Sequence, residues 1–221
     1  MSTKTRRLVF TALFAALTTA FTLISIPLAT GYFNFGDLVI YIASVSLGPL
    51  YGAIVGAIGG ALGDAILGYI AYMPFTLVIK ALEGVIVGLV YKAVCKFCAN
   101  KKSGNILEIT FTLLANLLAG SVMALGYFLA EGLLLSDAHW SGGLVNLPFN
   151  FLQGAISSCV AIILLYPCQL KKVFARFFNK NAQSATNQSP IIKDTDKEVQ
   201  SEENENKNDD NSDNSSEGKK L

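Results

Sequence analysis

Six long apolar segments run through the sequence, and their length limits what the chain can fold into. A helix that crosses the hydrocarbon core of a bilayer needs about 20 apolar residues, with a range of about 17–25. The apolar segments predict helices at residues 8–29, 37–48, 50–70, 73–95, 106–133 and 144–168. Of the 221 residues, 52% are hydrophobic, a high fraction for a water-soluble domain. We therefore predict an all-α integral membrane bundle of six transmembrane helices, whose short second helix ends at Gly48-Pro49.

Lysine and arginine lie almost entirely on one side of this predicted bundle. They precede the first segment, separate the fourth from the fifth, and follow the sixth: Lys4, Arg6, Arg7, Lys92, Lys96, Lys101, Lys102, Lys171, Lys172, Arg176 and Lys180. The connections on the opposite side contain neither residue type. By the positive-inside rule, both termini are predicted to be cytoplasmic in a multi-pass protein of the cell membrane. Lys80 is the exception, because it falls inside the fourth segment.

Residues 179–221 have a different composition from the rest of the chain. They contain ten acidic residues against six lysines, no aromatic residue and few apolar ones. Such a segment cannot bury enough apolar surface to offset the entropy lost on folding. We predict two parts: a six-helix membrane domain at 1–178 and a disordered acidic cytoplasmic tail at 179–221.

Polar residues inside the apolar segments gather toward the outer half of the predicted bundle. The fourth segment carries Lys80 and Glu83, which are three residues apart and therefore share a helical face. The third, fifth and sixth segments contribute Asp64, Tyr127, Glu131, Asn146, Asn150 and Gln153. Asn34 and Asp37 stand at the outer start of the second segment. Because charges at membrane depth usually face the protein interior and mark a ligand or ion path, we predict that the residues of the third to sixth segments line an outward-facing binding pocket.

Two of these patterns also fit a purely structural role. Lys80 and Glu83 would neutralise each other as an ion pair without touching a ligand. Asn146, Asn150 and Gln153 follow one another along a single helical stripe, which would also suit hydrogen bonds between helices. The sequence leaves both alternatives open.

Small residues recur at every fourth position in two segments. The third segment has Gly52, Gly56, Gly60 and Gly68 at this spacing, with Asp64 on the same face, and the first segment has Ala12, Ala16 and Ala20. Small residues at this spacing let membrane helices approach closely. For the alanines, tight packing within the bundle is the alternative to contact with another protein.

Several blocks of the sequence resemble the substrate-binding S component of energy-coupling factor (ECF) vitamin transporters. The similarity covers residues 8–168 and rests on GDLVIYIASVSLGPLYGAIVGAIGGALGD, PFTLVIKALEGVIVGL and NLPFNFLQG. The resemblance implies a high-affinity subunit that binds a small water-soluble vitamin in an outward-facing pocket. It further implies a membrane T subunit and two cytosolic ATPase subunits as partners, with Ala12, Ala16 and Ala20 on the face that meets the T subunit.

The remaining motifs favour binding over catalysis. The chain has no G-x-x-x-x-G-K-[ST], so the energy for transport must come from a partner. His139 is the only histidine, and Cys95 and Cys98 form a single C-x-x-C pair, which is too few ligands for a structural zinc site. We predict a protein that is not an enzyme and needs no cofactor, metal or nucleic acid. The alternatives are a stand-alone secondary transporter, which needs a matching repeat in both halves, and a membrane enzyme acting through Asp64, Glu131 or His139.

The identity of the vitamin stays open at this point. Lys80, Glu83 and several amides suit a polar heteroaromatic ring, such as that of riboflavin, hydroxymethylpyrimidine or pyridoxine. Lys80 alone suits the carboxylate of pantothenate equally well.

Overall fold

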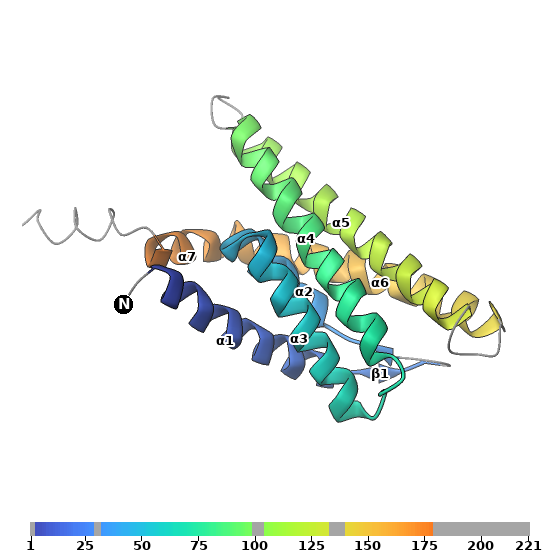
Figure 1. Cartoon of the computed structure of the whole chain (residues 1–221). Coiled ribbons are helices and arrows are strands. Elements are labelled where there is room, and N and C mark those ends of the chain that lie inside the picture. The colour runs from blue at the N-terminus through green and yellow to red at the C-terminus, as the bar shows by residue number, and fades with distance from the viewer. Residues whose placement is uncertain (1–2, 29–31, 99–103, 133–139, 179–221) are drawn as a thin grey trace, which may run out of the picture. The chain divides into compact units, whose positions relative to one another are not determined.

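The computed structural model describes residues 3–28, 32–98, 104–132 and 140–178. In these ranges the chain is almost entirely helical (Figure 1). The helices are α1 (Thr3–Leu23), α2 (Gly36–Leu47), α3 (Pro49–Leu67), α4 (Met73–Cys98), α5 (Gly104–Ala130), α6 (Trp140–Leu165) and α7 (Leu170–Phe178). Contacts divide the chain into one unit at 1–178 and another at 179–221. The disordered acidic tail lies outside the described residues and stays a prediction.

Five of the described helices are long and apolar enough to cross a bilayer. They comprise Lys4–Leu23 of α1, α3, α4, Ile106–Ala130 of α5, and α6. The predicted second span corresponds to α2, which has only 12 residues. The prediction of a membrane protein built from apolar helices is therefore confirmed, whereas the count of six spans and the cytoplasmic termini stay predictions.

The short helix α2 occupies the centre of the unit. It contacts α1, α3, α4 and α6 and is buried on all its faces, with Ile40, Tyr41 and Ala43 fully inaccessible. A helix that is apolar all round needs such an environment. The chain leaves α2 at Gly48, whose positive φ of 99° favours glycine, and Pro49 then begins α3 as a first-turn residue.

Helix α3 packs closely against α4, and its glycines are the reason. A Cβ atom at Gly84 of α4 would lie 2.5 Å from the backbone carbonyl oxygen of Gly52, and one at Gly56 would overlap the backbone carbonyl oxygen of Lys80. At Gly60 a Cβ atom would meet the side chains of Thr76 and Lys80. The spacing of small residues therefore lets the backbone of α3 lie directly against the turn of α4 that carries Lys80.

The first helix differs from its predicted boundaries. Helix α1 ends at Leu23 rather than at residue 29, and the chain continues into a two-stranded antiparallel ribbon of β1 (Ile26–Pro27) and β2 (Tyr32–Phe33). Proline at the end of β1 prevents a helical continuation because it lacks an N–H donor. This ribbon, which the sequence analysis did not predict, brings Tyr32 and Asn34 to the start of α2.

Basic residues gather at one end of the unit, which we call the basic end: Lys4, Arg6, Arg7, Lys92, Lys96, Lys171, Lys172 and Arg176. Helix α7, also unpredicted, packs here on α1, with the Phe174 ring centroid 5.8 Å from that of Phe10 and 5.3 Å from that of Phe14. Nearby, the Glu108 carboxylate accepts hydrogen bonds from Tyr91 (3.1 Å) and Tyr166 (3.0 Å) and pairs with Lys171. These contacts join α4, α5, α6 and α7.

Candidate functional site

A polar pocket lies at the opposite end of the unit from the basic end, between the ribbon and helices α1, α3, α4, α5 and α6. It encloses about 490 Å³ of space, including the part that is open to the outside. Seven of the eight predicted pocket residues line it: Asp64, Lys80, Tyr127, Glu131, Asn146, Asn150 and Gln153. The eighth, Glu83, is fully buried one turn of α4 beyond Lys80 and does not line the pocket. The role predicted for Glu83 in substrate binding therefore stays a prediction, and in this structure Glu83 reaches the pocket only through its contact with Lys80.

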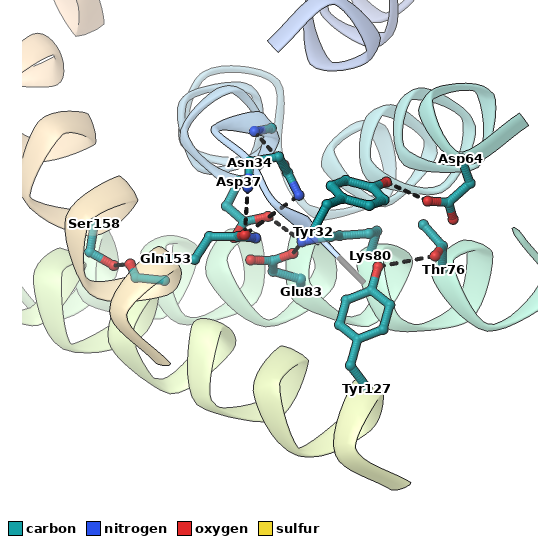
Figure 2. Close-up of polar contacts among 12 residues, drawn as sticks. Tyr32, Asn34, Asp37, Asp64, Thr76, Lys80, Glu83, Tyr127, Gln153 and Ser158 are labelled. Atoms are coloured by element: carbon teal, nitrogen blue, oxygen red, sulfur yellow. Dashed lines mark hydrogen bonds and ion pairs between the residues drawn. The ribbon is translucent and has the colours of Figure 1, made fainter. Parts of the chain in front are cut away.

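Lys80 forms the floor of this pocket together with two carboxylates (Figure 2). Its Nζ pairs with Asp37 of α2 and lies 3.1 Å from Glu83 Oε2 on its own helix. Only 4% of Lys80 is exposed, and both acids are inaccessible. The ion pair predicted between Lys80 and Glu83 is present, but it is part of a triad in which one ammonium bridges two carboxylates on different helices.

Gln153 of α6 holds the ribbon and α2 in place. Its Nε2 donates to Asp37 Oδ2 (2.8 Å), and its Oε1 accepts from the backbone N–H of Asn34 (2.8 Å). The Asn34 side chain in turn accepts from the backbone N–H of Gly36 (2.8 Å), where α2 begins. Because both ends of the Gln153 amide are engaged, its orientation is fixed. Gln153 therefore links the pocket floor to the ribbon above it.

Another part of the pocket wall is formed by Tyr32, Asp64, Thr76 and Tyr127, which belong to β2, α3, α4 and α5. The Tyr32 hydroxyl donates to Asp64 Oδ1, and the hydroxyls of Thr76 and Tyr127 are 3.0 Å apart. Burial, with a further contribution from the Asp64 carboxylate, raises the pKa of Tyr32, so this phenol keeps its proton and acts as the donor. The Lys80 Nζ lies 5.7 Å from the centre of the Tyr127 ring, within the range of a cation–π interaction.

Elsewhere in the pocket lining, Asn146 of α6 contacts Glu131, the residue that follows α5. The Asn146 Nδ2 lies 3.2 Å from each of the two carboxylate oxygens of Glu131. Asn150 lines the pocket one turn further along α6 and is 8% exposed. The predicted stripe of Asn146, Asn150 and Gln153 therefore both lines the pocket and makes contacts between helices, so the two interpretations of it do not exclude each other.

Three tyrosines pack together beside the pocket. The ring centroids of Tyr32 and Tyr69 are 4.9 Å apart, and those of Tyr69 and Tyr72 are 5.8 Å apart. Tyr32 and Tyr72 line the pocket, and sequence reasoning missed both. A sequence pattern that could have pointed to both tyrosines is present in the connections ATGYFNFG and GYIAYM. In each connection, aromatic residues stand next to a segment that carries polar residues.

The described residues contain no group of three or more histidine, cysteine, aspartate or glutamate side chains that could hold a metal ion. His139, named above as a residue for a membrane enzyme, lies outside the described residues. Cys95 is half-buried and Cys98 is buried, and neither forms a disulfide.

The predicted docking alanines lie on the surface of the described unit. Ala12, Ala16 and Ala20 are all exposed on α1, whereas Ala15 is buried within the bundle. Leu13 and Leu17 are exposed beside them, at 61% and 42%. The alternative for these alanines, tight packing inside the unit, does not agree with this exposure.

Comparison with known proteins shows what this chain is similar to. Residues 2–172 match the family model described as ECF-type riboflavin transporter, S component. A protein of Pyrococcus woesei, described as "Uncharacterized protein in gap 3'region", is 38% identical over 144 residues, which cover 65% of this chain and 86% of that protein. The matched family is one of transport proteins and not of enzymes. The chain therefore belongs to the S components of ECF-type riboflavin transporters and is a multi-pass membrane protein of a transport system.

Proposed function

We propose that this S component binds riboflavin in the polar pocket and passes it into the cell with a membrane T subunit and two cytosolic ATPase subunits. The description of the matched family supports the choice of riboflavin. The observation that carries the proposal is the pocket itself, where amide, phenol, ammonium and carboxylate groups from several helices meet at one depth.

The chemistry of the pocket agrees with a heteroaromatic ring that carries a hydroxylated chain. The uracil-like edge of a flavin alternates carbonyl acceptors with an N–H donor, which suits the mixed amides of Asn150 and Asn146. The ribityl hydroxyls are donors as well as acceptors. Asp64 Oδ2 is buried and has no hydrogen-bond partner among the described residues, so it is free to accept from such a hydroxyl.

The same geometry disfavours pantothenate. A ligand carboxylate needs a cation with spare charge, but Lys80 already pairs with Asp37 and Glu83. Adding a third carboxylate to one ammonium would leave the group of charges strongly negative in a buried site.

We further propose six spans with both termini in the cytoplasm, so that the pocket opens to the outside. Support comes from the basic end, which the positive-inside rule assigns to the cytoplasm, and from the position of the pocket at the other end. We propose that the membrane T subunit docks on the exposed stripe of Ala12, Ala16 and Ala20. A helix of the T subunit can approach closely there because these residues are small.

The direct test is to purify the full-length protein in detergent and identify any small molecule that it retains by mass spectrometry. Stripped protein is then titrated with riboflavin, hydroxymethylpyrimidine, pyridoxine and pantothenate by isothermal titration calorimetry. We expect saturable 1:1 binding of riboflavin and no measurable binding of pantothenate at the same concentrations. Tighter binding of any of the other three compounds would replace riboflavin as the substrate.

A further inference from the structure

Helix α7 has an apolar side that packs only partly on the bundle. Leu170 and Phe174 pack against the buried core. Val173 and Phe177 continue this apolar side at helical spacing, yet they are 43% and 47% exposed. Water would leave these two neighbouring apolar side chains without cover, which is unfavourable. The apolar side of α7 is therefore wider than the part that the bundle covers.

The opposite side of α7 carries positive charge. Lys172 and Arg176 are four residues apart, so they share a helical face, and both are exposed. Neither forms an ion pair with another of the described residues, whereas Lys171 pairs with Glu108. The helix, LKKVFARFF, contains no acidic residue. Two of its cations are therefore available to an anionic partner.

Contacts with α1 fix the level of α7 along the bundle. The Phe174 ring centroid lies 5.8 Å from that of Phe10 and 5.3 Å from that of Phe14. Both of these phenylalanines belong to Lys4–Leu23, the part of α1 that is apolar enough to cross a bilayer. Helix α7 is therefore held against the apolar part of the bundle and not beyond it.

Both ends of α7 are held close to membrane-spanning helices. At its start, only residues 166–169 separate it from α6. At its end, Arg6 of α1 donates from Nη1 to the backbone carbonyl oxygen of Phe177 (3.1 Å). Figure 1 shows α7 beside the start of α1. The helix thus lies along the boundary between the apolar spans and the basic end, which is the level of the lipid headgroups.

From this arrangement we infer that α7 is an interfacial helix that binds anionic phospholipids at the basic end. Val173 and Phe177 enter the edge of the acyl region, and Lys172 and Arg176 contact the headgroup phosphates. Helices with one apolar and one basic side lie in the plane of the interface, with the apolar side about 5–10 Å into the boundary between headgroups and acyl chains. This surface is separate from the polar pocket, which lies at the other end of the unit, and it does not depend on the identity of the vitamin.

Tryptophan fluorescence measures the depth of α7, because Trp140 is the only tryptophan of the chain. Trp140→Phe with Phe177→Trp places a single reporter on the apolar side. Trp140→Phe with Lys172→Trp is the matched control, with its reporter about 140° around the helix on the basic side. The full-length variants are reconstituted in vesicles of phosphatidylcholine and phosphatidylglycerol whose acyl chains carry bromine, a contact quencher.

We expect the reporter at position 177 to emit at shorter wavelength and to lose most of its fluorescence to the bromines. The reporter at position 172 should keep most of its fluorescence. If the first variant does not fold, Trp140→Phe with Val173→Trp supplies a second reporter on the same exposed apolar side.

The same reporter at position 177 measures which lipid gathers around α7. Bromine is placed on one lipid of the mixture at a time, and quenching by brominated phosphatidylglycerol is compared with quenching by brominated phosphatidylcholine at the same mole fraction. One basic residue near an anionic surface strengthens the attraction about fivefold, so we expect phosphatidylglycerol to be preferred by about fivefold or more.

Substitutions in the reporter background assign this preference to the basic side of α7. Lys172→Gln with Arg176→Gln should abolish it, whereas Lys172→Arg with Arg176→Lys, which keeps both charges, should retain it. Lys92→Gln with Lys96→Gln is the matched control, because it removes two exposed cations of the same spacing from the last turns of α4. These turns lie apart from α7 (Figure 1), so salt screens their charges from it and the preference should not change.

Three results would overturn the inference. A reporter at position 177 that emits at long wavelength and escapes the bromines would show that the exposed apolar side of α7 is a surface for a protein partner and not for lipid. Equal quenching by the two brominated lipids would show that α7 enters the bilayer without binding anionic headgroups. An equal loss of preference in the α4 and α7 glutamine variants would show that the net charge of the basic end, and not α7, attracts the lipid.

Discussion

Lys80→Met is the substitution that best tests how the pocket works. Methionine has a similar length to lysine and keeps the apolar contacts of its stem, while it removes the ammonium that bridges Asp37 and Glu83. Asp37 keeps its hydrogen bond from Gln153 (2.8 Å). The two carboxylates remain buried without their shared cation, and they can reduce the cost by taking up protons.

The expected loss follows from the geometry. If Lys80 donates a charge-assisted hydrogen bond to the flavin, its removal costs about 1.5–3 kcal/mol, which corresponds to roughly ten- to hundredfold weaker binding. Removal of one partner from a buried ion pair also destabilises a fold by about 3–5 kcal/mol when the other partner stays charged. We therefore expect both weaker riboflavin binding and a lower midpoint of thermal unfolding.

A control variant distinguishes these two effects. Lys80→Met with Asp37→Asn and Glu83→Gln removes all three charges of the floor and leaves no uncompensated carboxylate. We expect this variant to recover most of the thermal stability, because the desolvated charges are gone, but not the affinity for riboflavin. Calorimetric titration and thermal unfolding in the same detergent measure the two quantities. An unaltered dissociation constant in the single variant would falsify the contact between Lys80 and the ligand and leave the triad a purely structural role.

Three further predictions concern the wall, the docking surface and the tail. Tyr32→Phe removes the donor to Asp64 and should weaken riboflavin binding by about tenfold in the same titration; unchanged affinity would place the ligand away from this wall. Ala16→Leu adds bulk to the exposed stripe of α1, so binding by the isolated protein should survive while uptake by the assembled transporter falls. Parallel loss of binding and uptake would contradict the docking assignment. Removal of residues 183–221 should leave riboflavin affinity and uptake close to normal, because this segment has few apolar residues with which to dock. A well-expressed truncated protein with a large loss of uptake would show that the tail contacts a partner.

The sequence predicts most of the helices and most of the pocket, for a simple physical reason. Lipid forces every long span to be apolar, so polar residues such as Asp64, Lys80 and Asn146 stand out, and the direction of each span then gives their depth. Depth alone does not give the direction in which a side chain points. Glu83 follows Lys80 by three residues, which rotates it by about 60° and moves it about 4.5 Å along the helix. That displacement is enough to bury it beneath the floor.

Other features depend on contacts that leave little trace in a single sequence. The sequence shows that Asp37 stands at the start of the second apolar segment, but its pairing with Lys80 depends on how α2 lies against α4, which no local pattern records. The ribbon has two residues in each strand, too few to show an alternating pattern. Helix α7 is too short to be recognised as a span, and its position depends on aromatic contacts between Phe174 and α1.

The close contact between α3 and α4 has a consequence for how such a protein changes its substrate in evolution. The backbone carbonyl of Lys80 rests against Gly56, and Gly84 rests against Gly52, so the position of the pocket floor depends on residues whose own atoms never meet the ligand. Side chains on the pocket walls are therefore the ones that can vary when a new vitamin is to be recognised. The glycines cannot vary with them, since any larger residue would separate the two helices and displace Lys80. Chains with different substrates are thus expected to share this helix spacing and to diverge at the walls that it supports.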